Sequence, residues 1–428
     1  MESITIFVIS AVILLLLGVN IATTLGISSV LFFLLERIPT STVVQRLFSG
    51  VDVVALLCIP FFILAGDLMA KGGIARRLVN VVNLFIGNVT GGLAFITIIV
   101  CAIFAAMTGS AMATCITIGT IMIPYMLEAG YSREFSTGVV SAGAVLGPII
   151  PPSTAMILYA VNTNTSVTEL YLLGIPAGII MAVALGIAAY LVARKNGYKG
   201  LSNQDEEGRK KSAKEVIMTI LGALPAIGSP IIILGFIYAG ICTPTESAVI
   251  ALIYSFLVGK FIYRELSFKD IPGILKNAAE STAKVMYIVS AAALFAWVIT
   301  YERVPQEVLT AMLSLSTDKN VIMLIILIIL FVMGAVLEAT PIILITVPMF
   351  LPVIQAVGIN PLHFGIVLTV AVCIGFVTPP FGTVLFTGIA IGNVSMQKLA
   401  RQLIPFIIAM IAALLLIAFI PQLTMFII

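Results

Sequence analysis

Long apolar stretches, separated by short polar or Gly- and Pro-containing segments, run through almost the whole chain. A straight helix needs about 20 residues to cross the hydrocarbon core of a bilayer. Ten stretches predict membrane spans, at residues 4–18, 20–35, 50–69, 132–162, 170–193, 216–239, 246–263, 279–300, 361–391 and 402–421. The first two are short, and we expect the segment from Gly18 to Gly26 to form the turn between them.

Two further apolar stretches, residues 88–130 and 320–357, are too long for one span and are interrupted near their middles by Gly with Ser or Glu. Non-helical backbone at membrane depth is tolerated only where protein or a water-filled cavity supplies hydrogen-bond partners. Both stretches therefore predict re-entrant helical hairpins. Residues 70–87 and 301–317 are amphipathic and follow corresponding spans, so we expect them to lie in the membrane interface.

The chain repeats itself, because the segment from about residue 60 to 160 recurs as 288 to 388 without a net insertion. Matching residues stand 228 positions apart, as in the pairs Pro124 and Pro352, Gly130 and Gly358, Pro151 and Pro379, Pro152 and Pro380, and Ser110 and Glu338. Such a duplication is typical of transporters built from two halves, whose solute site lies where the halves meet near the bilayer midplane.

Composition agrees with a membrane protein. Of the 428 residues, 61% are hydrophobic and only 10% are charged, and the mean hydropathy is +1.21, so much of the surface must face lipid. The class predicted is an all-α polytopic membrane protein. The N-terminal stretch lacks a basic region and a small-residue cleavage site, which indicates a retained first span. The five Cys stand in apolar stretches without CxxC spacing, which favours free thiols.

The distribution of Lys and Arg predicts how the spans are oriented in the membrane. If the basic segment 194–215 is cytoplasmic, both termini lie outside, and 18 of the 22 Lys and Arg fall in or beside inside segments. The span 50–69 then runs inward and its partner 279–300 runs outward, so the two repeats are inverted. The first hairpin opens from the cytoplasm and the second from outside.

This orientation predicts five consecutive parts of the chain. They are scaffold helices at 1–59, the first repeat with its hairpin and broken helix at 60–193, a cytoplasmic linker at 194–215, scaffold helices at 216–287, and the second repeat at 288–428.

Polar chemistry concentrates at four interruptions. The hairpins turn at MTGSA (107–111) and GAVLEATP (334–341), and the spans that follow break at GPIIPPS (147–153) and GFVTPPFGT (375–383). A Pro-Pro pair leaves carbonyl oxygens without helical partners, and such oxygens with nearby Ser and Thr hydroxyls suit a small cation such as Na⁺. The half-helices that start near Ser153 and Gly382 direct positive dipole ends at the same region, which suits a carboxylate. One such Pro pair could be ordinary helix bending, but two at equal repeat positions favour a binding site.

Glu338 is the one acid at a predicted hairpin tip. Because burying its charge is costly, it is a functional candidate. Three roles remain open for it: supporting a cation site, relaying a proton, or accepting backbone hydrogen bonds at the turn. Asp67, Glu246 and Glu280 lie nearer the predicted interfaces and are expected to cap or anchor helices, and the only His, His363, is expected to be structural.

At these interruptions the chain resembles a known family. The runs that begin GSAMATC at residue 109 and GAVLEATP at residue 334, together with IPFFILAGDLMAKGGIARRLV (59–79) and GFIYAGICTPTESA (235–248), are similar to the large membrane subunit of tripartite ATP-independent periplasmic (TRAP) transporters, the DctM-like family. The resemblance covers essentially the whole chain. Departures are Ala371, where the family often has Asn, and Ala113 with Thr114, where a more polar pair is common.

The resemblance implies a Na⁺-coupled importer of an organic acid, of the sialic acid or C4-dicarboxylate class, that works by an elevator mechanism in the bacterial inner membrane. It also implies a small four-span membrane subunit and a periplasmic substrate-binding protein as partners. Carried over by motif, one Na⁺ site takes Thr108, Gly109, Ser110, Gly147 and Pro151. The other takes Gly334, Glu338, Thr340, Gly375, Thr378 and Pro379, and the solute is bordered by Ser153, Thr154, Gly382 and Thr383.

Two other functions compete with a secondary transporter. A channel would not need two oppositely oriented re-entrant hairpins. The chain lacks the residues that an intramembrane metalloprotease or aspartyl protease would use, since it has one His, no HExxH and no paired mid-membrane aspartates. No GxxxxGK[ST] motif occurs, which argues against ATP-driven transport.

Overall fold

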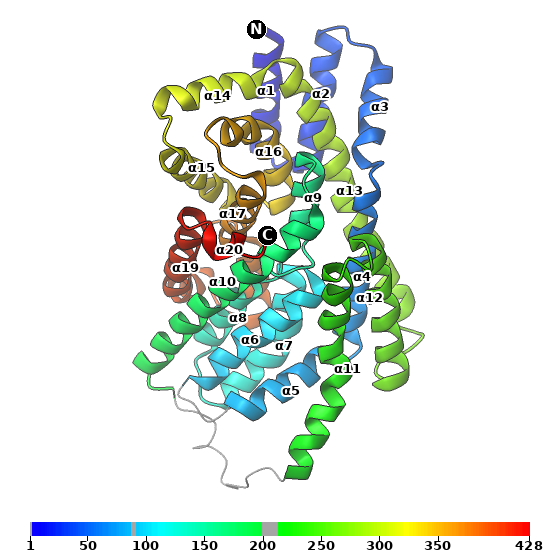
Figure 1. Ribbon diagram of the computed structural model, residues 1–428, viewed down its shortest axis with the longest axis vertical. Helices are drawn as coiled ribbons and strands as arrows, with labels where there is room; N and C mark the ends of the chain where they lie inside the picture. Colours follow the sequence, from blue (N-terminus) through cyan, green and yellow to red (C-terminus); the bar gives the residue numbers. More distant parts are fainter. Residues whose placement is uncertain (1, 87–90, 199–212) are drawn as a thin grey trace.

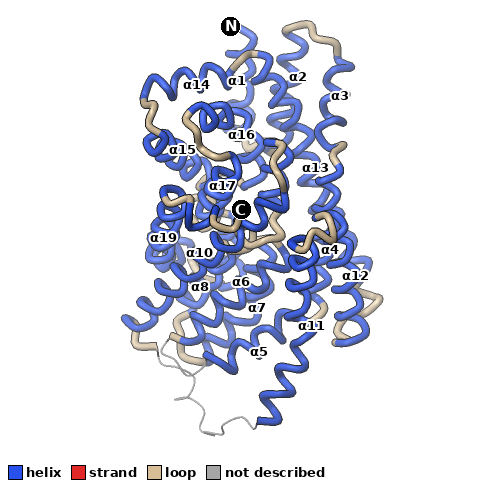
Figure 2. The backbone as a smooth tube through the Cα atoms, in the orientation of Figure 1, coloured by secondary structure: helices blue, strands red, loops and turns tan. Residues whose placement is uncertain are grey.

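The computed structural model describes residues 2–86, 91–198 and 213–428, and this part of the chain contains helices and no strand (Figure 2). Eight helical segments among the described residues are long and apolar enough to cross a membrane. The predicted all-α polytopic class is therefore confirmed.

The described residues of the first half of the chain form ten α-helices and one 3₁₀ turn. In chain order they are α1 (Glu2–Leu16), α2 (Ile21–Leu35), α3 (Thr40–Val51), η1 (Val54–Leu57), α4 (Cys58–Lys71), α5 (Ile74–Ile86), α6 (Gly92–Thr108), α7 (Ala111–Glu128), α8 (Arg133–Ala144), α9 (Thr154–Thr163) and α10 (Val167–Lys195).

The second half follows the same plan. Its helices are α11 (Ala213–Tyr238), α12 (Pro244–Leu257) with a π-helical end η3 (Val258–Ile262), α13 (Ile271–Tyr301), α14 (Val304–Leu315), α15 (Lys319–Gly334), α16 (Ala339–Ala356), α17 (Pro361–Gly375), α18 (Thr383–Gly392), α19 (Met396–Phe419) and the short α20 (Gln422–Met425).

The two halves correspond helix by helix. The pair α7 and α16 begin 228 residues apart, as do α8 and α17. Both predicted hairpins are present, as α6 with α7 and as α15 with α16, and both broken spans are present, as α8 with α9 and as α17 with α18. Figure 1 shows α5 near the lower end of the molecule and α14 near the upper end, so the corresponding arms lie at opposite ends, as inverted repeats require.

Side-chain caps explain where several helices begin. The hydroxyls of Ser110, Ser132, Ser153 and Ser166 each accept a hydrogen bond from a backbone N–H in the first turn of the helix that follows. At Thr243 a complete capping box forms with Glu246, whose carboxylate accepts the Thr243 backbone N–H at 2.8 Å. The first N–H groups of a helix have no partner within it, so these residues fix each start. The expected capping role of Glu246 is confirmed.

Several predicted boundaries are wrong. The span expected at 50–69 does not form as one helix, because the backbone leaves helical geometry at Asp52 and Val53; a separate helix α3 precedes it. The corresponding helix α13 runs unbroken from Ile271, which is earlier than the expected start at 279. Gly26 lies inside α2, and only Gly18, at φ +77°, belongs to the first turn.

The helices form two regions, which differ in the elements that pack together. In the first, α4 lies against α12 and α13, and α13 also lies against α2 and α3. In the second, the repeats cross over, because α7 of the first hairpin contacts α18 and α16 of the second hairpin contacts α9. Each hairpin therefore touches the half-helix of the other repeat.

The five Cys are free thiols, four of them buried. The linker was predicted at 194–215, and residues 199–212 of it lie outside the described residues. That its Lys and Arg residues lie on the cytoplasmic side stays a prediction.

Candidate solute and cation site

The first hairpin turns sharply at Gly109. Thr108 is the last residue of α6, Gly109 adopts the left-handed conformation at φ +62°, and Ser110 caps α7 by accepting the Ala113 N–H at 3.3 Å. Only glycine adopts this conformation without a steric penalty, and it is the usual residue after the end of a helix. The sequence MTGSA therefore makes a two-residue link between antiparallel helices.

This tip packs backbone to backbone against the first broken span. A Cβ atom on Gly147 would lie 2.6 Å from the carbonyl carbon of Ser110, and one on Gly109 would meet the carbonyl oxygen of Pro152. The structure thus brings Thr108, Gly109 and Ser110 together with the residues around Gly147 and the Pro151–Pro152 bond. Thr108, Gly109, Gly147, Pro151 and Pro152 are buried, and Ser110 is partly buried.

Hydroxyl groups line the same tip. Thr108 Oγ1 and Thr114 Oγ1 are 3.3 Å apart, and Thr114 Oγ1 donates to the carbonyl oxygen of Ser110 at 2.8 Å. A hydroxyl that donates one hydrogen bond keeps lone pairs that can face a cation. Thr114 was not among the predicted ligands, although its position four residues after the Ser110 cap could have indicated it.

The second hairpin tip repeats this contact with other residues. Gly334 lies directly against Gly375, where a Cβ would overlap the Gly334 backbone. The Phe381 N–H donates to the carbonyl oxygen of Ala335 at 3.2 Å, which ties the second break to the tip. Within the break, the Thr378 hydroxyl donates to the carbonyl oxygen of Ile374 at 2.8 Å. Gly334, Gly375 and the segment that contains Thr378 and Pro379 are therefore brought together.

Glu338 occupies the N-cap position of α16, two residues before Thr340. Its side chain is exposed and makes no capping hydrogen bond, so the structure does not show one of the three roles left open for it, that of accepting backbone hydrogen bonds at the turn. Pro379, Pro380 and Phe381 of the facing break are exposed as well, and Phe381 is 57% exposed. The second hairpin tip and its facing break are thus exposed at these residues, whereas the corresponding residues of the first are mostly buried.

The four predicted solute-bordering residues lie at the starts of the two short half-helices. Ser153 is the N-cap of α9, is fully buried, and donates from its hydroxyl to the carbonyl oxygen of Pro148 at 2.5 Å. Thr154 and Thr383 are partly buried first residues of α9 and α18, and Gly382 is the buried N-cap of α18. The positive ends of α9 and α18 therefore begin at the two breaks.

One contact between the repeats was not predicted from the sequence. The Tyr159 hydroxyl of α9 donates to the carbonyl oxygen of Pro361 at the start of α17, at 2.6 Å. A Cβ on Gly365 would collide with the Tyr159 ring at 2.5 Å. This contact fixes the first half-helix against the second broken span. His363, near the same end of α17, is buried with Nε2 3.1 Å from the carbonyl oxygen of Ala418, in keeping with a structural role.

Residues 8–423 match the family model of the tripartite ATP-independent periplasmic transporter, DctM component. The chain belongs to this family. It is 32% identical over 427 residues to the C4-dicarboxylate TRAP transporter large permease protein DctM of Rhodobacter capsulatus, with 96% of each chain covered. It is also 32% identical over 381 residues to the sialic acid TRAP transporter large permease protein SiaM of Vibrio cholerae, with 89% of this chain and 88% of that protein covered.

A longer relative also aligns with almost all of this permease. It is the isethionate TRAP transporter permease protein DctMQ of Oleidesulfovibrio alaskensis, 38% identical over 413 residues; the alignment covers 96% of this chain and 64% of the relative's length. Among solved structures, the Alcanivorax borkumensis YdaH transporter is similar with a TM-score of 0.63 at 14% identity, covering 88% of this chain and 86% of that one. That likeness concerns the fold. The family and the helices together make this chain a multi-pass transporter subunit of the inner membrane.

Proposed function

We propose that this permease subunit imports an organic acid together with Na⁺ by an elevator movement of its two hairpins and broken helices. The observation that carries this proposal is the repeated backbone contact between each hairpin tip and the break of its own repeat, Ser110 with Gly147 and Gly334 with Gly375. These contacts gather carbonyl and hydroxyl oxygens at two equivalent places.

Na⁺ is the coupling ion that these groups suit best. Carbonyl and hydroxyl oxygens are hard, neutral ligands, and near the first tip they come from Thr108, Ser110 and the break around Pro151. Near the second tip Thr378 and the exposed carboxylate of Glu338 add to the carbonyls. In transporters of this design, unwound backbone and helix ends coordinate the coupling cations.

An organic acid is the solute that the half-helices suit best. The starts of α9 and α18, at Thr154 and Thr383, present backbone N–H groups and positive dipole ends, which stabilise an anion. Three relatives are named for isethionate, C4-dicarboxylate and sialic acid, each an organic acid. The solute of this chain is therefore a carboxylate or a related organic anion.

The elevator movement is supported by the division of contacts. The hairpins and half-helices contact each other across the repeats, and α2, α3, α4, α12 and α13 form a second group, which touches the hairpins where α13 meets α16 and α4 meets α6. The arms α5 and α14 connect the two regions from opposite ends (Figure 1). A unit formed by the first group can shift against the second as a rigid body.

The partners proposed are a small four-span membrane subunit and a periplasmic substrate-binding protein, because the family is tripartite. Both termini lie on the periplasmic side if the basic residues around the linker, such as Arg194 and Lys195, are cytoplasmic.

Uptake assays test this function. The chain is reconstituted into liposomes with the small subunit, and the binding protein loaded with a labelled organic acid is added outside. We expect uptake that requires an inward Na⁺ gradient and both partners. Equal uptake when K⁺ or choline replaces Na⁺ at fixed pH would exclude Na⁺ coupling, and full uptake by the chain alone would exclude the tripartite mechanism.

A further inference from the structure

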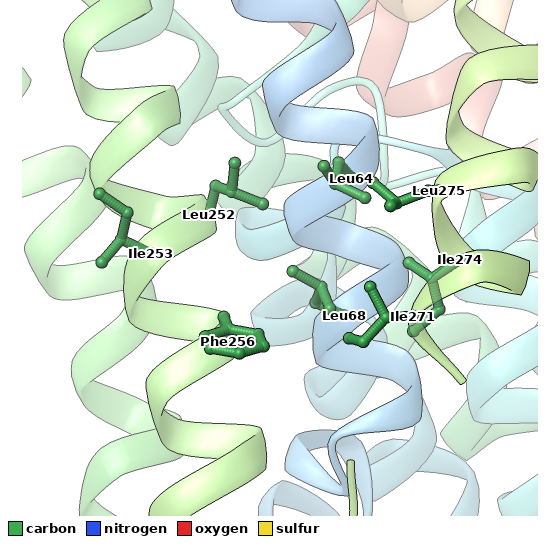
Figure 3. Close-up of a pocket in the computed structure, with 8 residues that line it drawn as sticks. All are labelled: Leu64, Leu68, Leu252, Ile253, Phe256, Ile271, Ile274 and Leu275. Atoms are coloured by element: carbon green, nitrogen blue, oxygen red, sulfur yellow. The ribbon is translucent and has the colours of Figure 1, made fainter. Parts of the chain in front are cut away.

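An apolar slot of about 290 Å³ lies between α4, α12 and the beginning of α13 (Figure 3). All eight residues that line it are Leu, Ile or Phe, namely Leu64, Leu68, Leu252, Ile253, Phe256, Ile271, Ile274 and Leu275. A carboxylate in this slot would find no hydrogen-bonding side chain, and burying it there would be costly. The slot therefore suits a hydrocarbon ligand and not the transported solute.

The slot is separate from the candidate cation site. Gly66 of α4 faces the first hairpin tip, since a Cβ there would lie 3.4 Å from Thr108 Cβ. Leu64 and Leu68 stand two residues before and after Gly66, which places them on the opposite face of the helix. The same helix thus separates the slot from the tip.

Each wall of the slot leads to a lysine at the same end. Lys71 is the last residue of α4, Lys260 lies in η3 after α12, and Lys269 stands just before α13. The ends of these elements meet, because a Cβ on Gly72 would lie 3.1 Å from the Cα of Gly259. Lys260 Nζ is 4.0 Å from the centre of the Phe268 ring, which holds it beside the segment that leads into α13.

These three lysines are not neutralised by nearby acids. Glu265 pairs with Arg77 at 2.7 Å and with Arg76 at 3.9 Å, and Asp270 accepts the Ser267 backbone N–H at 3.0 Å. Lys71, Lys260 and Lys269 form no ion pair with any described residue. Their charges are available to an anion.

The surroundings place this end at the membrane interface. Tyr263 follows Lys260 by three residues and its ring lies 3.7 Å from the Arg77 guanidinium, and Tyr with basic residues is typical of that depth. Leu68 and Leu64 precede Lys71 by three and seven residues, so they lie about 5 and 10 Å deeper along the helix. A cationic rim above a hydrocarbon slot matches the two parts of a phospholipid.

We propose that this slot binds an acyl chain of an anionic glycerophospholipid, whose phosphate lies at Lys71, Lys260 and Lys269. The acyl chain fills the space between α4 and the α12–α13 wall, and the headgroup is attracted by three uncompensated charges. The bound lipid supports the helix that carries Gly66 against the first hairpin tip.

Native mass spectrometry of the purified, delipidated full chain tests the acyl site. Phosphatidylglycerol and phosphatidylcholine are titrated separately, and retained lipid is counted. Ile253→Trp fills the slot from its rim, where Ile253 is 54% exposed; Ile187→Trp on α10, at 56% exposed, is the matched control. We expect wild type and Ile187→Trp to retain one phosphatidylglycerol that Ile253→Trp loses. If Ile253→Trp melts below wild type, Leu275→Trp on another wall, 50% exposed, takes its place.

The charge of the headgroup is tested with the lysines. We expect Lys260→Gln and Lys269→Gln each to weaken phosphatidylglycerol binding about fivefold, with no change for phosphatidylcholine. Lys319→Gln, at the start of α15, is the control and should change neither.

Three results would overturn the proposal. The first is unchanged phosphatidylglycerol retention in a stably folded Ile253→Trp or Leu275→Trp variant, and the second is equal affinity of wild type for both lipids. The third is cross-linking of Ile253→Cys to the small membrane subunit in the assembled complex, because the slot would then be a protein interface.

Discussion

Gly147 lies against the backbone of Ser110 so closely that a Cβ atom on Gly147 would be 2.6 Å from the Ser110 carbonyl carbon. The first broken span and the first hairpin tip therefore meet through their main chains at this point. The second repeat achieves the same contact with Gly375 and Gly334. Contact of this kind brings carbonyl oxygens together, and it requires glycine at positions 147 and 375 of the two broken spans.

Gly147→Ala should lower both stability and transport, because the added methyl group forces the tip away from the break. Overpacking of this kind costs about 1–3 kcal/mol. The control is Gly222→Ala on α11, where a Cβ meets nothing within 4 Å. We expect that control to melt at or above the wild-type temperature. Thermal melting and Na⁺-driven uptake of both variants check this, and a Gly147→Ala protein with wild-type melting and uptake would contradict the close contact.

Glu338→Gln and Thr378→Val should raise the Na⁺ concentration for half-maximal uptake by roughly tenfold, with little change in melting temperature. Losing one oxygen ligand at such a site costs on the order of 1–3 kcal/mol. Glu338 is exposed and makes no capping hydrogen bond, so its loss removes little that stabilises the fold.

Glu280→Gln serves as the control for those two variants, since Glu280 is exposed and forms one ion pair within the described residues, with Lys276 of the same helix at 3.9 Å. Its Na⁺ curve should match that of wild type. Unaltered Na⁺ curves in both Glu338→Gln and Thr378→Val would show that the second cation site lies elsewhere.

Thr243→Ala should destabilise the chain by about 1 kcal/mol and leave the Na⁺ dependence of uptake unchanged. The substitution removes the hydroxyl that accepts the Glu246 backbone N–H in the capping box, so this N–H at the start of α12 loses its partner. Thr310→Ala, whose hydroxyl bonds only to the carbonyl oxygen of Gln306 in its own helix, is the matched control. Equal melting temperatures for the two variants would argue against the cap.

Arg77 and Glu265 should show a coupling free energy of up to about 1 kcal/mol in a double-mutant cycle, decreasing with salt. Arg77 Nη1 lies 2.7 Å from Glu265 Oε1, and its guanidinium stacks 3.7 Å from the centre of the Tyr263 ring. Both ionic side chains are partly exposed, at 26% and 28%, so the coupling stays modest. The cycle uses Arg77→Ala, Glu265→Ala and the double variant, measured by thermal melting at low and high salt. Additive effects would mean that the contact does not fasten α5 to the segment before α13.

The sequence alone determined the elements that repeat and the places where they break. Apolar stretches of about 40 residues interrupted by glycine must turn back, because one span cannot contain them. The Pro151–Pro152 and Pro379–Pro380 pairs stop a helix at a fixed place for local steric reasons. These local signals sufficed for the two hairpins and the two broken spans, whereas the assignment of the candidate site residues stays a prediction.

Only the tertiary structure decided which segments meet. No local pattern shows that α7 lies against α18 and α16 against α9, or that Tyr159 bonds to Pro361, since these contacts join residues about half a chain apart. The sequence also predicted one span at 50–69 as the counterpart of 279–300, yet α3 ends at Val51 and α4 begins only at Cys58, while α13 runs unbroken from Ile271 to Tyr301. Lipid-facing and protein-facing apolar side chains look alike in sequence. Shape complementarity over many distant residues therefore set the packing, the closure of the first tip and the openness of the second.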